Sequence, residues 1–328
     1  MASAIRPRRG RSRSGRARTL RSPKVAAGSL ILLFFVLLAA FGPMAAPHTP
    51  DWRASRLDNV PHPPSAQFWL GTDVQQHDLF SQLLAGGRDT LLIAFVAGGI
   101  ATVLSVLVGV SAGYLGGKTD EVLSILTNIF LALPGLLILM VVMKMMPDGD
   151  TGNPLLIGAV IALSAWAWGA RVLRAQTLAL RNQDYVDSAR VVGESRVRII
   201  VFEILPNLLP ILASSFIFTV IYGIGAYASL AWLGLINPTT ASWGTMLNTA
   251  QQFSATTSGT WWWYGPPALC VALVGIALAL LNFGIDEIVN PRMRSTRRGR
   301  RSDRGPRFQL GLTPVVRDVV RAEEGIRP

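Results

Sequence analysis

Residues 171–210 read RVLRAQTLALRNQDYVDSARVVGESRVRIIVFEILPNLLP, a polar, arginine-rich stretch inside an otherwise apolar chain. The stretch is longer than a connector between two hydrophobic segments needs to be. Small or apolar residues recur in it at three- and four-residue steps, at Val186, Ala189, Val192 and Gly193. This spacing predicts short amphipathic helices around a turn at Gly193.

Pro206 marks the predicted end of this polar stretch. A proline disfavours helix at the residue before it, so we expect a break at Leu205 and a turn into the next apolar run. From the residues alone, the stretch suits two roles equally. It would either fill a cleft in another protein or lie flat on a lipid surface.

The rest of the chain has the composition of an integral membrane protein. Half of its 328 residues are hydrophobic and only 15% are charged, which is unlike a soluble enzyme. Six runs are apolar and long enough to cross a bilayer, since about 20 residues are needed. They cover residues 25–46, 90–115, 122–146, 154–174, 208–232 and 266–289. We therefore predict an all-α, polytopic fold with six transmembrane helices.

The basic residues predict the orientation of these helices. Residues 1–24 hold nine Lys or Arg and no acid, and residues 292–328 hold eleven Arg against four acids. Arginine-rich loops and tails stay inside, so both termini and the loop at about 171–207 are expected in the cytoplasm. The Arg/Ser run at the N-terminus abuts a span, which favours a basic, disordered anchor over a nucleic-acid-binding arm.

The first hydrophobic run has two interpretations. The basic start, the run Leu30–Ala40 and the small residues Ala45 and Ala46 are also typical of a cleaved signal peptide. We favour a retained anchor, because the run and its flanks are long enough to span and complete a six-span pattern.

The sequence offers little for catalysis or metal binding. The one cysteine, Cys270, excludes an intramolecular disulfide and a cysteine-based metal site. All three histidines precede the second span, so histidine-based chemistry inside the membrane is not expected. The spacing of His62, His77 and Asp78 is not diagnostic of a metal site and favours solvated side chains. We expect no catalytic residue, metal or cofactor in this chain.

Two further expectations concern the spans. The uncharged segment 233–265 ends in Trp261, Trp262 and Trp263, which predicts an aromatic belt at the membrane interface. No carboxylate lies near the middle of a span, so coupling to protons or sodium is weakly supported. The energy for any transport would then come from another subunit.

Several motifs resemble those of ATP-binding cassette importer permeases for dipeptides, oligopeptides and nickel. Asp187-Ser188-Ala189, with Gly193 six residues after the acid, is similar to the EAA motif, although its usual form is Glu-Ala-Ala. Glu203 stands where the peptide permeases usually have His. The resemblance covers about residues 68–294 and includes GTD at 71–73, GYLGGKTD at 113–120, LAWLGL at 230–235, SWGTML at 242–247 and NPR at 290–292.

This resemblance implies a type I importer permease fold in the bacterial inner membrane. Its regions would be a basic tail at 1–24, a first span at 25–46, an extracytoplasmic segment at 47–89, a permease core of five spans at 90–290 and a second tail at 291–328. Expected partners are a second, related permease, an extracytoplasmic solute-binding protein and two cytoplasmic ATPases, which would bind ATP and Mg²⁺.

The resemblance also implies which residues couple the chain to the ATPases. They are Asp187, Ser188, Ala189, Gly193, Glu203, Leu205, Pro206 and Asn207. The expected function is import of di- or oligopeptides by alternating access, with nickel or another small solute as an alternative and a non-transporting scaffold as a distant one. Substrate-binding residues cannot be chosen from the sequence.

Overall fold

The computed structural model describes residues 23–54, 60–147, 149–237 and 240–289. The predictions for the two basic tails lie outside these residues, except for the last two positions of the first tail. The helices in chain order are α2 (Pro23–Ala45), α3 (Leu79–Leu115), α4 (Gly117–Ala132), α5 (Gly135–Met145), the 3₁₀-helix η1 (Asp150–Gly152), α6 (Pro154–Leu180), α7 (Asp184–Val191), α8 (Arg196–Arg198), the π-helix η2 (Ile199–Ile204), α9 (Leu205–Trp232), α10 (Trp243–Gln252) and α11 (Trp261–Val289).

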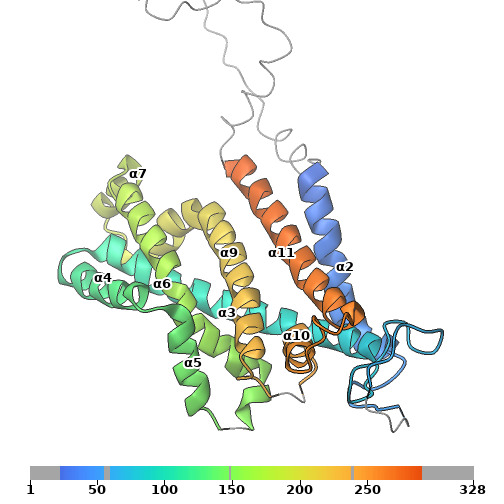
Figure 1. Cartoon of the computed structure of the whole chain (residues 1–328). Helices are drawn as coiled ribbons and strands as arrows, with labels where there is room; N and C mark the ends of the chain where they lie inside the picture. The colour runs from blue at the N-terminus through green and yellow to red at the C-terminus, as the bar shows by residue number, and fades with distance from the viewer. Residues whose placement is uncertain (1–22, 55–59, 148, 238–239, 290–328) are drawn as a thin grey trace, which may run out of the picture. The chain divides into compact units, whose positions relative to one another are not determined.

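The described part of the chain is helical and rich in membrane-length helices (Figure 1). Five helical segments are long and apolar enough to cross a membrane, and the bent pair α4–α5 makes six if it counts as one span. The predicted all-α, multi-span architecture is therefore confirmed. Apart from helices, this part of the chain contains two isolated antiparallel bridges, Arg53 with His77 and Thr72 with Asp78.

The second span starts earlier than hydropathy indicates. We expected it from residue 90, but α3 begins at Leu79 and runs for 37 residues. The carboxylate of Asp78 caps its first turn by accepting a hydrogen bond from the backbone N–H of Phe80. The predicted start at residue 90 followed from the charged residues Arg88 and Asp89, which interrupt the apolar run. The helix nevertheless continues through them, because the turns of a helix that lie outside the membrane core tolerate charges.

Small residues allow α3 and α6 to pack closely. Gly109 and Gly113 lie one turn apart on α3, and each faces α6. A Cβ at Gly113 would come within 2.7 Å of the Cβ of Thr177 and 2.8 Å of the carbonyl oxygen of Arg174. This is the close helix approach that glycine permits in a membrane, where dispersion contacts replace the hydrophobic effect between helices.

A second core joins α2, α3, α9, α10 and α11. Phe35 of α2 is 2% exposed and meets Trp243 of α10 edge to face, with ring centroids 5.5 Å apart. Gly28 of α2 faces the backbone of α11, where a Cβ would lie 2.8 Å from the carbonyl oxygen of Ala277. One face of the first apolar run therefore packs against this core, and the run lies beside α11 (Figure 1), while most of its residues are exposed.

One of the three tryptophans before the last span does not fit the expected belt. Trp263 is 1% exposed and stacks on Phe253, whereas Trp261 is 60% exposed. The prediction was wrong for Trp263 because α11 begins at Trp261, which turns successive side chains to different faces of a helix. Trp261 keeps the exposure that interfacial anchoring requires, and Trp262 is intermediate in exposure.

The third span is broken at Pro134. α4 ends at Ala132, α5 begins at Gly135, and their axes differ by 87°. Pro134 provides no backbone N–H and disfavours helix at Leu133, which is extended (φ −80°, ψ 134°). The apolar run at 122–146, predicted as one span, is therefore divided into two helices.

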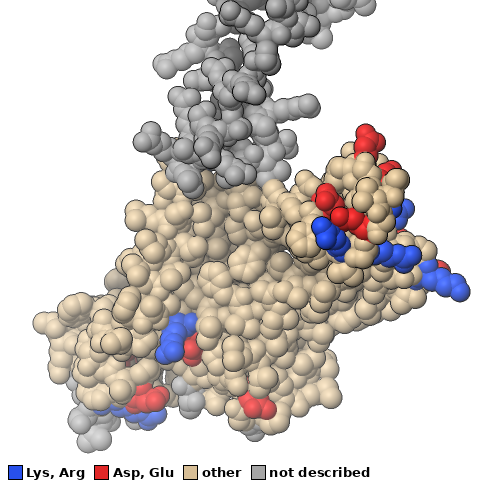
Figure 2. All heavy atoms as spheres, turned by 180° about the vertical axis from the view of Figure 1, so that it is seen from behind, with Lys and Arg blue, Asp and Glu red and all other residues tan. Residues whose placement is uncertain are grey.

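Charged side chains are unevenly distributed on the molecule. On the face shown in Figure 2, they gather over the end that carries α7 and α8 and around the opposite part of the molecule, with a broad, nearly uncharged surface between. This pattern is typical of a protein that is surrounded by lipid along its middle.

Candidate coupling site

The polar stretch folds into two short helices joined by a glycine turn. α7 covers Asp184–Val191, and α8 starts at Arg196. Gly193 has φ +85°, its N–H donates to the carbonyl of Arg190 (3.0 Å), and Glu194 N–H donates to the carbonyl of Ala189 (3.1 Å). These two bonds form a Schellman motif, which uses glycine because side chains disfavour a positive φ. The helix–Gly–helix prediction is thus confirmed.

One buried residue seats α7 on the ends of the spans. Val186 is fully buried in a cluster that joins α3, α6, η2 and α9. The other buried members are Val110, Tyr114, Leu173, Ile199, Ile204 and Leu208. Burying a valine side chain contributes about 1.5 kcal/mol or more, so this contact holds the short helix in place.

Polar contacts tie the same element to its neighbours. Arg181 donates from Nη1 to the carbonyl oxygen of Gly113 (3.1 Å), and the guanidinium of Arg190 lies over the ring of Tyr114, 5.5 Å from its centroid. On the other side, Asn207 of α9 approaches the Tyr185 hydroxyl at 3.4 Å. α7 is therefore fixed to α3 on one side and to α9 on the other.

The surroundings of Tyr185 favour the protonated form of its hydroxyl. Partial burial and the nearby carboxylate of Glu203 both raise the pKa of Tyr185. The raised pKa extends the protonated form to higher pH, and at neutral pH a phenol with an ordinary pKa of about 10 is already protonated.

The expected break at Leu205 does not occur. Leu205 is helical (φ −59°, ψ −41°), and its N–H bonds to the carbonyl of Ile200, five residues back. Pro206 lies in the first turn of α9, where a missing N–H is tolerated. The chain avoids the break by widening the preceding turn into the π-helix η2, so helical structure continues from Arg196 to Trp232.

The outer surface of this element is apolar and open. Val191 and Val192, at the end of α7, are 88% and 81% exposed, and Val197 of α8 is 71% exposed. Single exposed apolar residues are common, but these lie among charged side chains on an element whose inner face is anchored. We call Val191, Val192 and Val197 the valine tip.

The eight predicted coupling residues fall on both sides of α7. Ala189 and Leu205 pack against the cluster around Val186, and Glu203 lies half-buried in η2. Exposed positions are Asp187, Ser188, Gly193, Pro206 and Asn207. Asp187 pairs with Arg190 at 2.7 Å, and the Ser188 hydroxyl donates to the carbonyl of Asp184 at 2.8 Å.

One contact near this site was not assigned a role from the sequence. Arg174 of α6 binds both carboxylate oxygens of Asp120 at the start of α4, at 2.5 and 2.7 Å. Arg171, one turn earlier, donates to the side-chain oxygen of Asn128 at 2.8 Å. Asp120 and Arg174 are 54 residues apart, so only their charges hinted at the pairing. The pair joins the first half of the broken span to α6.

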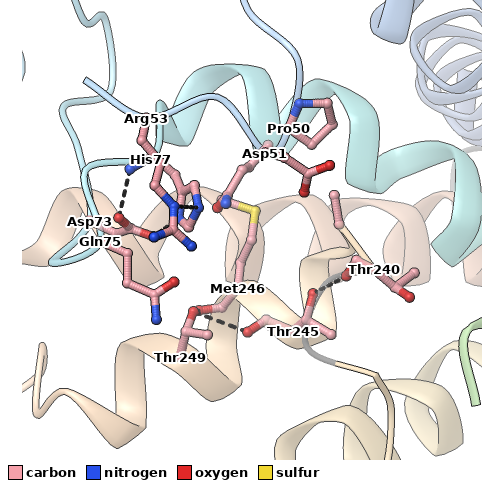
Figure 3. Close-up of a pocket in the computed structure, with 12 residues that line it drawn as sticks. Pro50, Asp51, Arg53, Asp73, Gln75, His77, Thr240, Thr245, Met246 and Thr249 are labelled. Atoms are coloured by element: carbon pink, nitrogen blue, oxygen red, sulfur yellow. Dashed lines mark hydrogen bonds and ion pairs between the residues drawn. The ribbon is translucent and has the colours of Figure 1, made fainter. Parts of the chain in front are cut away.

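A polar pocket of about 300 Å³ lies beside α10, away from α7 (Figure 3). Residues 50–53, the turn before α3 and the start of α10 build it. Its labelled lining residues are Pro50, Asp51, Arg53, Asp73, Gln75, His77, Thr240, Thr245, Met246 and Thr249. Arg53 donates from Nε to Nε2 of His77 (3.2 Å), so the other ring nitrogen, Nδ1, donates to Asp73 (2.8 Å).

The polar residues around this pocket are structural, contrary to the sequence-based expectation of solvated side chains. His77 and Asp78 are 9% and 3% exposed and have different partners. Asp78 accepts from Ser81 at 2.5 Å and contacts His48 at 3.2 Å. Hydrophobicity alone could not predict that these side chains are buried. Each carboxylate can be buried because it has a specific hydrogen-bond partner, and the sequence does not show which residue that partner is.

These features define a multi-span membrane protein that presents one anchored, apolar-tipped element at a charged end. A family model described as "Binding-protein-dependent transport system inner membrane component" matches residues 105–295. A second, "N-terminal TM domain of oligopeptide transport permease C", matches residues 13–69. The chain belongs to the family of inner membrane components of binding-protein-dependent transport systems, which are permease subunits of ABC importers.

Curated relatives match along most of their length. The dipeptide transport system permease protein DppC of Bacillus subtilis is 32% identical, over 84% of this chain and 85% of the relative. The oligopeptide transport system permease protein OppC of the same organism is 31% identical, over 84% and 88%. A solved structure of the inward-facing MetNI methionine ABC transporter has a TM-score of 0.44 at 21% identity, over 67% of this chain and 97% of that chain.

Proposed function

We propose that this chain is one of two permease subunits of an ATP-driven peptide importer, and that α7, the Gly193 turn and α8 form its coupling element. The peptide assignment is supported by the names of the relatives, DppC and OppC. The other subunits are a second permease, two cytoplasmic ATPases that bind ATP and Mg²⁺, and an extracytoplasmic solute-binding protein.

The valine tip is the observation that carries the coupling role. Val191 and Val192 are exposed beside Asp187 and Arg190, in an element held from below by Val186. An ATPase cleft lined by apolar side chains with a polar rim would bury the valines and read the charges. A helix lying on lipid would also bury valines, but the exposed carboxylates around them disfavour that position.

The anchoring contacts suggest how force reaches the spans. α7 contacts α3 through Arg190 and Tyr114, and α9 through Tyr185 and Asn207. Displacement of α7 by ATP-driven closure would therefore move the ends of both spans together. The ATPase pair would have a closed and an open state. Each state would bind one arrangement of the spans, outward-open or inward-open, more tightly than the other and so favour it. In this scheme Gly193 allows the turn between α7 and α8. Pro206, in the first turn of α9, lies where displacement of α7 and α8 would be transmitted to α9.

The polar pocket lies beside α10, away from α7, and suits the extracytoplasmic side. Asp51 and Arg53 are exposed at its rim, and the relay from Arg53 through His77 to Asp73 holds the guanidinium in place. A solute-binding protein would find charged and amide groups there for a hydrogen-bonded, transient contact.

The direct test is reconstitution of the four kinds of subunit in proteoliposomes, with uptake of an isotope-labelled tripeptide mixture measured with and without ATP. Uptake that needs ATP and the binding protein is expected. Gly193→Trp should abolish peptide-stimulated ATP hydrolysis while the variant stays in the membrane, and Gly99→Ala, at a site with nothing within 4 Å of the added Cβ, is the control. Uptake of NiCl₂ but of no tripeptide would replace the peptide assignment, and full coupling in Gly193→Trp would refute the role of the element.

A further inference from the structure

A small, mostly apolar pocket that includes three hydroxyl-bearing side chains lies halfway along two spans. It has a volume of about 290 Å³ and is lined by Ser164, Ala165 and Trp168 of α6 and by Phe218, Thr219 and Tyr222 of α9. These positions are near the middle of α6 and of α9, so the pocket lies at mid-membrane depth. We call these six residues the mid-span pocket.

The polar atoms of this pocket are only partly used within the chain. The Ser164 hydroxyl is 3.1 Å from the carbonyl of Ile161, to which it donates, so Tyr222 donates to Ser164 across 3.0 Å. The Thr219 hydroxyl donates to the carbonyl of Ser215 at 2.8 Å. The oxygens of Tyr222 and Thr219 therefore keep lone pairs that can accept a hydrogen bond from a ligand.

The pocket also adjoins the broken span. A Cβ at Gly135, the first residue of α5, would lie 2.8 Å from the Tyr222 hydroxyl and 3.6 Å from the Cβ of Ser164. Leu133, in the break, is 49% exposed. Backbone that is not helical occurs at membrane depth only where protein covers it or where it lines a water-filled cavity. This end of the pocket therefore does not face lipid.

The remaining walls are aromatic. Trp168, Phe218 and Tyr222 are 54%, 49% and 40% exposed, and the rings of Trp168 and Phe218 meet edge to face with centroids 6.1 Å apart. None of the six lining residues carries a charge or a side chain that metals commonly prefer. The pocket suits an uncharged group with an apolar part and an N–H donor.

We propose that the mid-span pocket lines the solute pathway and receives an apolar side chain of a peptide in transit, with Tyr222 and Thr219 accepting hydrogen bonds from the adjacent peptide N–H groups. This proposal rests on the peptide import proposed above. Packing of the second permease into the pocket is the competing occupant. The unused acceptor oxygens favour the peptide over a helix of the second permease. The backbone N–H groups inside a helix are already bonded to its own carbonyls, whereas those of an extended peptide are available to donate.

The first test measures access of water to the pocket in the full importer complex in nanodiscs. In a Cys270→Ala background, Thr219→Cys is treated with a charged, membrane-impermeant methanethiosulfonate reagent. Ile276→Cys is the matched control, because Ile276 is 51% exposed near the middle of α11. We expect Thr219→Cys to react about tenfold faster or more than the control, since charged reagents avoid hydrocarbon, and excess Ala-Phe-Ala to slow it. Ser164→Cys is the second variant if Thr219→Cys does not fold.

The second test measures selectivity. Trp168→Ala should bring the uptake ratio of Ala-Phe-Ala to tri-alanine close to one, and Tyr222→Phe should lower uptake of both about three- to tenfold, the usual range for one lost hydrogen bond. Slow labelling equal to the control, labelling that neither tripeptide slows, or a thiol cross-link from position 219 to the second permease would overturn the proposal. ATP-dependent uptake by the parent complex is scored separately, so failure of peptide import itself remains distinguishable.

Discussion

The valine tip yields a quantitative prediction about ATPase binding. Val191 and Val192 are 88% and 81% exposed, so nearly all of their side-chain area is available for burial by a partner. At about 1.5 kcal/mol for each buried valine, the low end for such side chains, replacing both with serine removes about 3 kcal/mol of binding free energy. Every 1.4 kcal/mol is a factor of ten, so the dissociation constant should rise about a hundredfold.

The assay is titration of purified ATPase subunits onto the permease pair in nanodiscs, comparing the parent with V191S/V192S. Thermal unfolding of the variant should match the parent, because both side chains are already in water in the free subunit. Val60→Ser is the matched control, since Val60 is 52% exposed but lies in the segment before α3. A dissociation constant within about threefold of the parent would refute the reasoning, because a difference that small is under 1 kcal/mol.

Three other predictions follow from the packing. Val186→Ala should lower the free energy of unfolding by about 1 to 3 kcal/mol, measured by thermal or denaturant unfolding, because it opens a cavity under α7 without changing the valine tip; unchanged stability would contradict the anchor role. Gly113→Ala should force α3 and α6 apart and cost about 1 to 3 kcal/mol by the same measurement, whereas Gly99→Ala should be tolerated; equal effects would contradict the close approach. Asp120→Asn should weaken the tie between α4 and α6 by about 1 kcal/mol, the order expected for a partly exposed bidentate pair, and Glu121→Gln should leave the unfolding temperature unchanged; a similar loss in both variants would mean that the pairing with Arg174 is not the cause.

Most of the architecture was predictable because lipid imposes a simple rule. Apolar runs of membrane length become helices, and five of the six predicted spans are continuous helices in the structure. Their ends were less predictable. Asp78 extends α3 outward through a cap, and hydropathy does not register a cap. The breaks depended on backbone bonding, because Pro134 ends a helix and Pro206 does not.

The coupling site was predictable in its local turn but not in its contacts. The spacing from Ala189 to Gly193 sufficed for helix–turn–helix, since a Schellman turn is set by neighbouring residues. The contacts of Arg190 with Tyr114 and of Asn207 with Tyr185 join distant segments, so no local pattern encodes them. The mid-span pocket was not predictable for the same reason. Its two walls come from different helices, and each hydroxyl alone resembles ordinary helix packing.

The π-helix η2 has a consequence for comparing this chain with its relatives. The hydrogen bonds of η2 join residues i and i+5, so a turn of this helix contains one residue more than a turn of an α-helix, whose bonds join i and i+4. Each residue of an α-helix rotates the chain by about 100°. The side chains of α8 are therefore rotated by about a quarter-turn relative to α9, compared with an uninterrupted helix. A relative that lacks this widened turn would present a different face of the segment before α9 at the same aligned position. Contact residues transferred by alignment across Ile199–Ile204 would then point in the wrong direction, and loss of a single residue there would reset the angular phase of the coupling element.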